Sequence, residues 1–247
     1  MSEDNPKTLH FLIWQHHDPP YVIHKSIYIA CKHLMIFRAI ASLFFLSIII
    51  WMFTDMSWKY FLFVTNWGFF LGFLFFLTVS IESIFVKNSH SFCWKFCHIL
   101  FEVALTIEFM IVIFYWTGLF YLDYDKHKND SDFSSWLFND ICIHFIGFLL
   151  LWTDNMFNHI KIYRKHFFFI ICVMICYMIV NCAYTLSEEN IYPPITWVDY
   201  VSYLCGLIVV FLLVLHHYFA IWFFERIKKK RIDHEEEKDT WQSNNLL

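Results

Sequence analysis

The sequence predicts an all-α protein, a polytopic transmembrane helical bundle with six spans and both termini on the cytosolic side. Of the 247 residues, 59% are hydrophobic and 22% aromatic, including 31 Phe, whereas only 16% are charged. Soluble domains usually carry about 25% charged residues. The charges also stand in short clusters between long apolar runs. These features exclude a soluble globular enzyme, and the formal net charge of −4 offers no basic surface for nucleic acid.

Six apolar stretches are long enough to cross a bilayer, which takes roughly 20 residues of helix. In chain order they are 34–53, 60–86, 96–121, 136–156, 167–186 and 199–224. They divide the chain into a cytosolic N-terminal segment (1–33), a six-helix transmembrane domain (34–224) and a charged cytosolic tail (225–247). The fourth stretch is the most polar, so four or five spans is the alternative count.

The orientation follows from the basic residues that flank these spans, because cytosolic loops are enriched in Lys and Arg. With six spans, thirteen flanking Lys and Arg residues fall on the side of the termini. The other side has only Lys59, Lys126 and Lys128. Asn129-Asp130-Ser131 is a glycosylation sequon and lies in the third loop, on that same non-cytosolic side. We therefore expect the termini to be cytosolic.

The eight cysteines predict neither disulfides nor a metal site. They lie either within the spans or on the expected cytosolic side, and both environments disfavour disulfides. No Cys-x-x-Cys pair is present. We expect no cofactor.

The fourth span carries a stripe of polar and small residues. Asp140, His144, Gly147, Leu151 and Asp154 follow one another at spacings of 4, 3, 4 and 3, which places all five on one helix face. Because ionisable side chains are costly in a bilayer, this face should point into the bundle.

Thr65, Gly68 and Gly72 form a second stripe, in the second span, and Gly68-xxx-Gly72 matches a close-packing motif of membrane helices. At about 1.5 Å per residue, Thr65 lies roughly 9 Å and His144 roughly 12 Å from the non-cytosolic side. A threonine and a histidine at similar depth suggest a nucleophile and its base, with Asp140 orienting the imidazole ring. The alternative is an interhelical hydrogen bond, which Thr and His also make in membranes.

The remaining buried charges point to structural pairing. His98 and Glu102 are one helical turn apart and are expected to pair, whereas Glu102 and Glu108 point about 240° apart on a regular helix. Arg38 in the first span is expected to neutralise one of these carboxylates or Asp154.

The stretch Trp58–Phe69 resembles a motif of a known family. Its sequence, Trp-Lys-Tyr-Phe-Leu-Phe-Val-Thr-Asn-Trp-Gly-Phe, is similar to the W-K-x-F-x-x-x-T-N-W-G-F stretch of the rolling-stone-like proteins. These proteins belong with the androgen-induced-gene-one proteins to one membrane superfamily. Weaker matches follow in order, covering most of the chain: Asn139 with His144, Asp154, and Ile191-Tyr192-Pro193 followed by Trp197.

The androgen-induced branch is similar to membrane threonine hydrolases that cleave fatty acid esters of hydroxy fatty acids. The resemblance therefore implies that Thr65 and His144 are the catalytic pair. The rolling-stone branch is instead associated with myoblast fusion, and this chain is closer to it through Thr65-Asn66-Trp67-Gly68. Residues 181–184 of this chain are Asn-Cys-Ala-Tyr, whereas the hydrolase branch carries clustered histidines at this place.

Three classes of function follow from these observations. The first is an intramembrane hydrolase of lipid esters that uses Thr65, His144 and Asp140, with Asn66 or Trp67 as candidate donors to the oxyanion. The second is a non-catalytic membrane protein acting in cell fusion or as an accessory subunit of a larger complex, with other membrane proteins as partners. The third is a transporter or redox protein, although no internal repeat of the transporter type is visible. All three place the chain in a lipid bilayer, with the plasma membrane or endoplasmic reticulum expected and another organelle membrane as the alternative.

Overall fold

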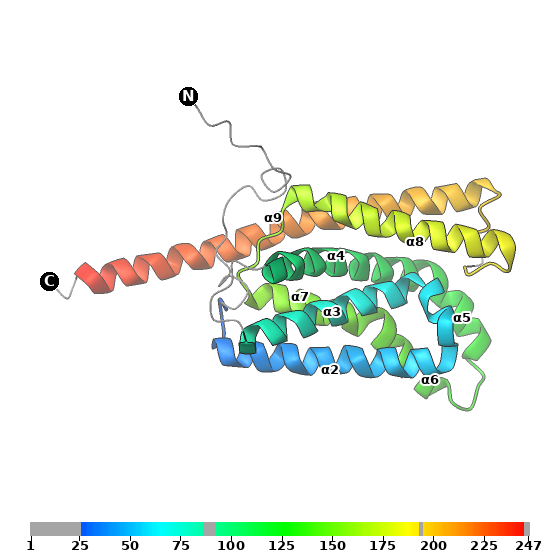
Figure 1. The fold of residues 1–247 in the computed structure, drawn as a ribbon, viewed down its shortest axis with the longest axis horizontal. Coiled ribbons are helices and arrows are strands. Elements are labelled where there is room, and N and C mark those ends of the chain that lie inside the picture. The colour runs from blue at the N-terminus through cyan, green and yellow to red at the C-terminus, as the bar shows by residue number, and fades with distance from the viewer. Residues whose placement is uncertain (1–25, 86–91, 193–194, 245–247) are drawn as a thin grey trace, which may run out of the picture.

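A computed structural model of the chain describes residues 26–85, 92–192 and 195–244, and within these ranges it is a bundle of helices without a β-strand (Figure 1). The predicted all-α fold class is confirmed. The first half of the bundle contains α2 (Cys31–Met56), the 3-10 turn η2 (Ser57–Leu62), α3 (Val64–Phe85) and α4 (Phe92–Phe114), which continues through the π-helical turn η3 (Tyr115–Leu119) into α5 (Phe120–His127). The second half contains α6 (Phe133–Ile141), the π-helical turn η4 (Cys142–Ile146), α7 (Gly147–Phe157), the 3-10 turn η5 (Arg164–His166), α8 (Phe167–Ser187) and α9 (Tyr200–Asn244).

Six helical segments of the described chain are long and apolar enough to cross a membrane, as the sequence predicts. They are Cys31–Leu62, Val64–Ile84, Trp94–His127, Phe133–Phe157, Arg164–Ser187 and Tyr200–Lys229. The second span begins at Val64 and not at residue 60, because Ser57–Leu62 form η2, which continues the first span. The protein is therefore an integral, multi-pass membrane protein.

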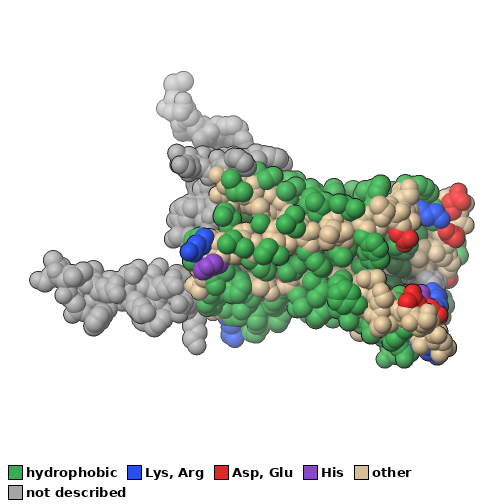
Figure 2. Space-filling view, turned by 90° about the horizontal axis from the view of Figure 1, so that it is seen from below, with side chains coloured by type: hydrophobic (Ala, Val, Ile, Leu, Met, Phe, Trp, Pro, Cys, Tyr) green, Lys and Arg blue, Asp and Glu red, His purple; other side chains and the backbone are tan. Residues whose placement is uncertain are grey.

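Charge and hydropathy divide the bundle into an apolar middle and two polar ends. Figure 2 shows apolar side chains over the middle, with Asp and Glu gathered at one end. The beginning of α2 lies at the opposite end, and α9 runs out past the bundle at that same end (Figure 1). Both termini of the bundle are thus on one side, and the assignment of that side to the cytosol stays a prediction from the basic residues.

The third span is the central helix of the bundle. In its most apolar stretch 72% of the residues are buried, against 22–39% in the other five spans. Aromatic rings pack between neighbouring helices here. Phe45 of α2 lies 4.9 Å from Phe69 of α3, and Phe75 of α3 lies 5.0 Å from Phe101 of α4, between ring centroids. The phenylalanine-rich composition therefore fills the core of the bundle as well as covering its surface.

Glycine brings α3 close to both of its neighbours, as the predicted Gly68-xxx-Gly72 motif requires. A Cβ atom added at Gly68 would lie 2.6 Å from Glu108 Oε1 and 2.8 Å from Ile111 Cδ1, both on α4. One added at Gly72 would lie 2.8 Å from the Phe45 ring on α2. Larger residues at these two positions would force the helices apart.

We predict that Gly68→Ala lowers the free energy of unfolding by about 1–3 kcal/mol, the usual cost of overpacking a core. The matched control is Gly206→Ala on α9, where an added Cβ meets no atom within 4 Å. Thermal unfolding in detergent should show a lower midpoint for the first variant only. Equal midpoints would contradict the close packing of α3 against α4.

A polar network joins α2, α7 and α9 at the end of the bundle that holds the termini. Arg38 donates to Asp154 through Nε at 2.6 Å and through its Nη2 at 3.0 Å, and both side chains are buried. Asn158 Nδ2 donates to Asp154 at 2.6 Å. Of the carboxylates that Arg38 was expected to neutralise, Asp154 is the one it meets.

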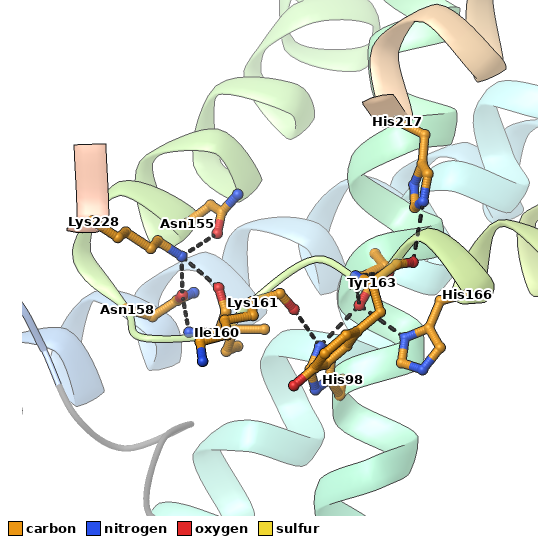
Figure 3. Close-up of polar contacts among 10 residues, drawn as sticks. His98, Asn155, Asn158, Ile160, Lys161, Tyr163, His166, His217 and Lys228 are labelled. Atoms are coloured by element: carbon orange, nitrogen blue, oxygen red, sulfur yellow. Dashed lines mark hydrogen bonds and ion pairs between the residues drawn. The ribbon is translucent and has the colours of Figure 1, made fainter. Parts of the chain in front are cut away.

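Lys228, in the part of the chain predicted to be a charged cytosolic tail, extends this network. Helix α9 continues to Asn244, and Lys228 is only 6% exposed. Its ammonium group donates to Asn155 Oδ1 at 2.8 Å, to Asn158 Oδ1 at 3.2 Å and to the Ile160 carbonyl at 2.5 Å (Figure 3). The lysine is buried because these three acceptors replace water around it.

We predict that Arg38→Leu lowers the free energy of unfolding by about 3–5 kcal/mol, because it leaves the buried Asp154 without its cation. The double variant Arg38→Leu/Asp154→Leu should recover much of this loss, since neither charge is then left unpaired. The control is Lys128→Ala, which breaks an exposed pair with Asp125 and should leave the unfolding midpoint unchanged. A double variant no more stable than the single one would contradict the argument.

Candidate active site

A cavity of about 490 Å³ opens at the end of the bundle formed by η2, α5 and the loop between α8 and α9. Thr65 of α3, Asp140 of α6 and His144 of η4 all contribute to its wall. These are the three residues that the sequence singled out. Its volume falls within the range typical of small-molecule sites.

Thr65 lies in the first turn of α3 and is 7% exposed. Its neighbours are held by hydrogen bonds to the preceding turn: Asn66 Nδ2 donates to the Tyr60 carbonyl at 2.6 Å, and Trp67 Nε1 donates to the Phe61 carbonyl at 2.7 Å. Tyr60 in turn donates from its hydroxyl to the Asn66 carbonyl at 3.1 Å. The Thr65 hydroxyl makes no hydrogen bond within the described residues, so it is available to a ligand.

These contacts correct the expectation that Asn66 or Trp67 donates to an oxyanion. The donor groups of both side chains are already used to fix η2 against α3. Backbone N–H groups are the remaining source, because the first turn of a helix has donors without intrahelical acceptors. Val64 donates its N–H to the Tyr192 hydroxyl at 3.0 Å and Asn66 donates its own to the Phe63 carbonyl at 3.1 Å. Of the backbone N–H groups of Val64, Thr65 and Asn66, that of Thr65 is therefore the candidate donor to the oxyanion.

His144 is held between a carboxylate and an aromatic ring. Its Nε2 lies 3.6 Å from Asp140 Oδ1, and its ring stacks on Tyr115 with centroids 3.6 Å apart and planes at 11°. The Tyr115 hydroxyl donates to Asp140 Oδ2 at 2.6 Å. His144 Nδ1 is buried without a hydrogen-bond partner in the described part of the chain. The three side chains therefore form a unit in which Tyr115 positions both Asp140 and His144.

Two π-helical turns create this stacking. Tyr115 begins η3 and His144 is the central residue of η4. A π-helical turn inserts an extra residue into an α-helix and is found frequently at functional sites. Here it occurs in both facing helices at the level of the cavity.

The predicted inward stripe of the fourth span is confirmed. Asp140, Gly147, Leu151 and Asp154 are buried, and His144 lines the cavity. Each carboxylate of the stripe has a polar partner, Tyr115 for Asp140 and Arg38 for Asp154.

The loop between α8 and α9 closes the cavity from one side. Tyr192 lines the cavity and its hydroxyl accepts the Val64 N–H, one residue from Thr65. Burial raises the pKa of Tyr192, so the hydroxyl stays neutral. Trp197 is anchored by donation from its Nε1 to Asn181 Oδ1 at 2.7 Å. Tyr192 and Trp197 belong to the weaker family matches, and Pro193 lies outside the described residues.

Comparisons with protein-family models, curated proteins and solved structures found no match to this chain. The resemblance to rolling-stone-like proteins therefore stays an expectation from the residues quoted above.

Sequence reasoning missed Tyr115 as a member of this site. Aromatic residues make up 22% of the chain, so nothing local in the sequence distinguishes Tyr115 from the others. The signal that was present is indirect: Asp140 needs a polar partner inside the bilayer, and a tyrosine on the neighbouring span can supply one. Among the described residues, the single cluster suited to a metal ion lies away from this cavity and contains none of these side chains.

We predict that Tyr115→Phe lowers the free energy of unfolding by about 1–3 kcal/mol, because it removes a hydrogen bond to a buried carboxylate but keeps the stacked ring. Tyr115→Leu should cost more, since the stacking on His144 is lost as well. The control is Tyr121→Phe, at a position that is 69% exposed. Thermal unfolding of the three variants measures the order, and a Tyr115→Phe variant as stable as the control would contradict it.

Proposed function

We propose that this membrane protein is an intramembrane hydrolase of lipid esters, with fatty acid esters of hydroxy fatty acids as the substrate class. Thr65 is the nucleophile, His144 is the general base, and Asp140 orients His144. The observation that carries the proposal is the shared cavity, whose wall holds Thr65, His144 and Asp140 together.

The surroundings of His144 suit the role of a base. Asp140 Oδ1 lies 3.6 Å from His144 Nε2, close enough for the carboxylate to orient the imidazole ring. Apo contacts between nucleophile and base often tighten only when substrate binds. Stacking on Tyr115 restricts rotation of the imidazole ring.

The reaction divides into two steps at Thr65. His144 removes the proton from Thr65 Oγ as that oxygen attacks the ester carbonyl, and the charge develops on the carbonyl oxygen near the N-terminus of α3. The helix dipole and the N–H of Thr65 would stabilise that charge. The alcohol then leaves with the proton from His144, and water hydrolyses the acyl-threonine to release the acid.

The lining of the cavity suits a substrate with an acyl chain and a reaction that needs water. Met110, Ile111, Phe114 and Ile143 form an apolar wall that an acyl chain can contact. Charged Asp123 and Lys126 stand at the polar end of the bundle and also line the cavity, which gives water a route to the ester.

The test is hydrolysis of a fatty acid ester of a hydroxy fatty acid by the purified full chain in detergent, measured by mass spectrometry of the released acid. Thr65→Ala and His144→Ala should each lower kcat by at least about a thousandfold, as loss of a nucleophile or its base does in serine hydrolases. A fluorophosphonate probe should label the wild type and Thr65→Ser but not Thr65→Ala.

The matched control is Thr185→Ala, because Thr185 is also a buried threonine (8% exposed) but does not line the cavity. It should retain activity and labelling. If Thr65→Ala hydrolyses the ester as fast as the wild type, the hydrolase proposal is wrong, and a non-catalytic role in cell fusion or in a larger membrane complex takes its place.

A further inference from the structure

A second cluster of ionisable side chains lies at the end of the bundle that holds the termini, away from the cavity. His98 and Glu102 occupy successive turns of α4, and His166 stands at the end of η5. Figure 3 shows His98 and His166 on either side of Tyr163. All three are at most 3% exposed. His98 and Glu102 were expected to pair, whereas His166 was not expected to join them.

The three side chains converge on one carboxylate oxygen. Glu102 Oε1 lies 2.8 Å from His98 Nε2 and 2.8 Å from His166 Nδ1. Each residue offers one atom that could coordinate a metal ion, and these three atoms lie within 4.8 Å of one another. The Lys161 carbonyl oxygen lies 2.6 Å from His98 Nε2 and is a fourth atom here that could coordinate a metal ion.

We propose that His98, Glu102 and His166 bind a divalent transition-metal ion, with Zn²⁺ as the best match. Two imidazole nitrogens and one carboxylate oxygen form a known protein ligand set for zinc, at about 2.0–2.2 Å from the ion. The spacing of four residues between His98 and Glu102 places two ligands on one helix face, and the third comes from another element. The Lys161 carbonyl or a water molecule completes a tetrahedral site.

The surroundings resemble the outer shell of a metal site, in which further groups orient the ligands. The Tyr163 N–H points at the Glu102 carboxylate, 3.2 Å from Oε1 and 3.3 Å from Oε2, and so fixes its plane. His217 Nε2 lies 3.2 Å from the Tyr163 carbonyl and holds that segment against α9. The ring of Tyr163 lies 5.3 Å from that of His98 and shields it.

The alternative for the same atoms is a hydrogen-bonded anchor in which both imidazoles donate protons to Glu102. A metal ion replaces those protons, because it binds the imidazole lone pairs and the ionised carboxylate. Both arrangements fasten α4 to the segment before α8, but only the metal site responds to added metal and to chelators. The two are therefore separable by experiment.

The experiment uses the full chain purified in detergent, stripped with a chelator and then dialysed against Zn²⁺. We expect about one equivalent of zinc per chain by elemental analysis, and an unfolding midpoint that rises with Zn²⁺ and falls again with the chelator, since a ligand that binds only the folded state stabilises it. Co²⁺ in place of Zn²⁺ should give the visible absorption of a tetrahedral site.

Glu102→Gln and His166→Ala should abolish the bound zinc and the Co²⁺ absorption. The matched control is His216→Phe: His216 is a fully buried histidine on α9 that stacks on Phe109 rather than joining the cluster. It should keep one equivalent of metal. Absence of stoichiometric zinc in the wild type, or zinc retained by both cluster variants, would overturn the proposal and leave the hydrogen-bonded anchor.

Discussion

The central position of the third span imposes the constraint on which the rest of the structure depends. A helix enclosed by its neighbours cannot leave polar side chains to water, so other elements must either supply a polar partner or leave room for them. Glu102 is met by two histidines at one end, and Tyr115 reaches Asp140 at the other. Between them Glu108 is fully buried, and it is accommodated because Gly68 and Gly147 have no side chain: a Cβ added at either would lie within 3.0 Å of its carboxylate. The contacts at Glu102, Glu108 and Tyr115 thus position the neighbouring helices around the third span.

The sequence predicted the features that depend on composition and regular periodicity. Six spans follow from length and hydropathy, and the stripe from Asp140 to Asp154 follows because a bilayer forces carboxylates inward. The partner of Arg38 could be narrowed only to a few carboxylates, since helix periodicity gives the direction of a side chain but not which helix lies opposite. Thr65 and His144 were placed at similar depth by counting residues, and both now line one cavity.

Features that depend on irregular backbone or on distant contacts could not be predicted. The π-helical turns at Tyr115 and His144 have no local sequence signal, yet they bring the two rings into contact. His166 joins Glu102 across 64 residues of chain, and no spacing rule reaches that far. Asn66 and Trp67 were assigned to the chemistry because they adjoin Thr65, whereas their side chains hold η2 in place. A motif that resembles a family pattern can thus combine a side chain whose hydroxyl is unbonded with neighbours whose donor groups hold the preceding turn.

The two polar clusters are tied to the same helix but are independent in chemistry. Thirteen residues separate Glu102 from Tyr115, which at about 1.5 Å per residue is roughly 20 Å along the axis. Glu108, which lies between them, forms no hydrogen bond within the described residues and so links neither cluster to the other. A change at one end therefore reaches the other only through the packing of the helix itself. It follows that a metal ion at Glu102 would act on the cavity as a clamp on the position of α4, without taking part in any chemistry at Thr65.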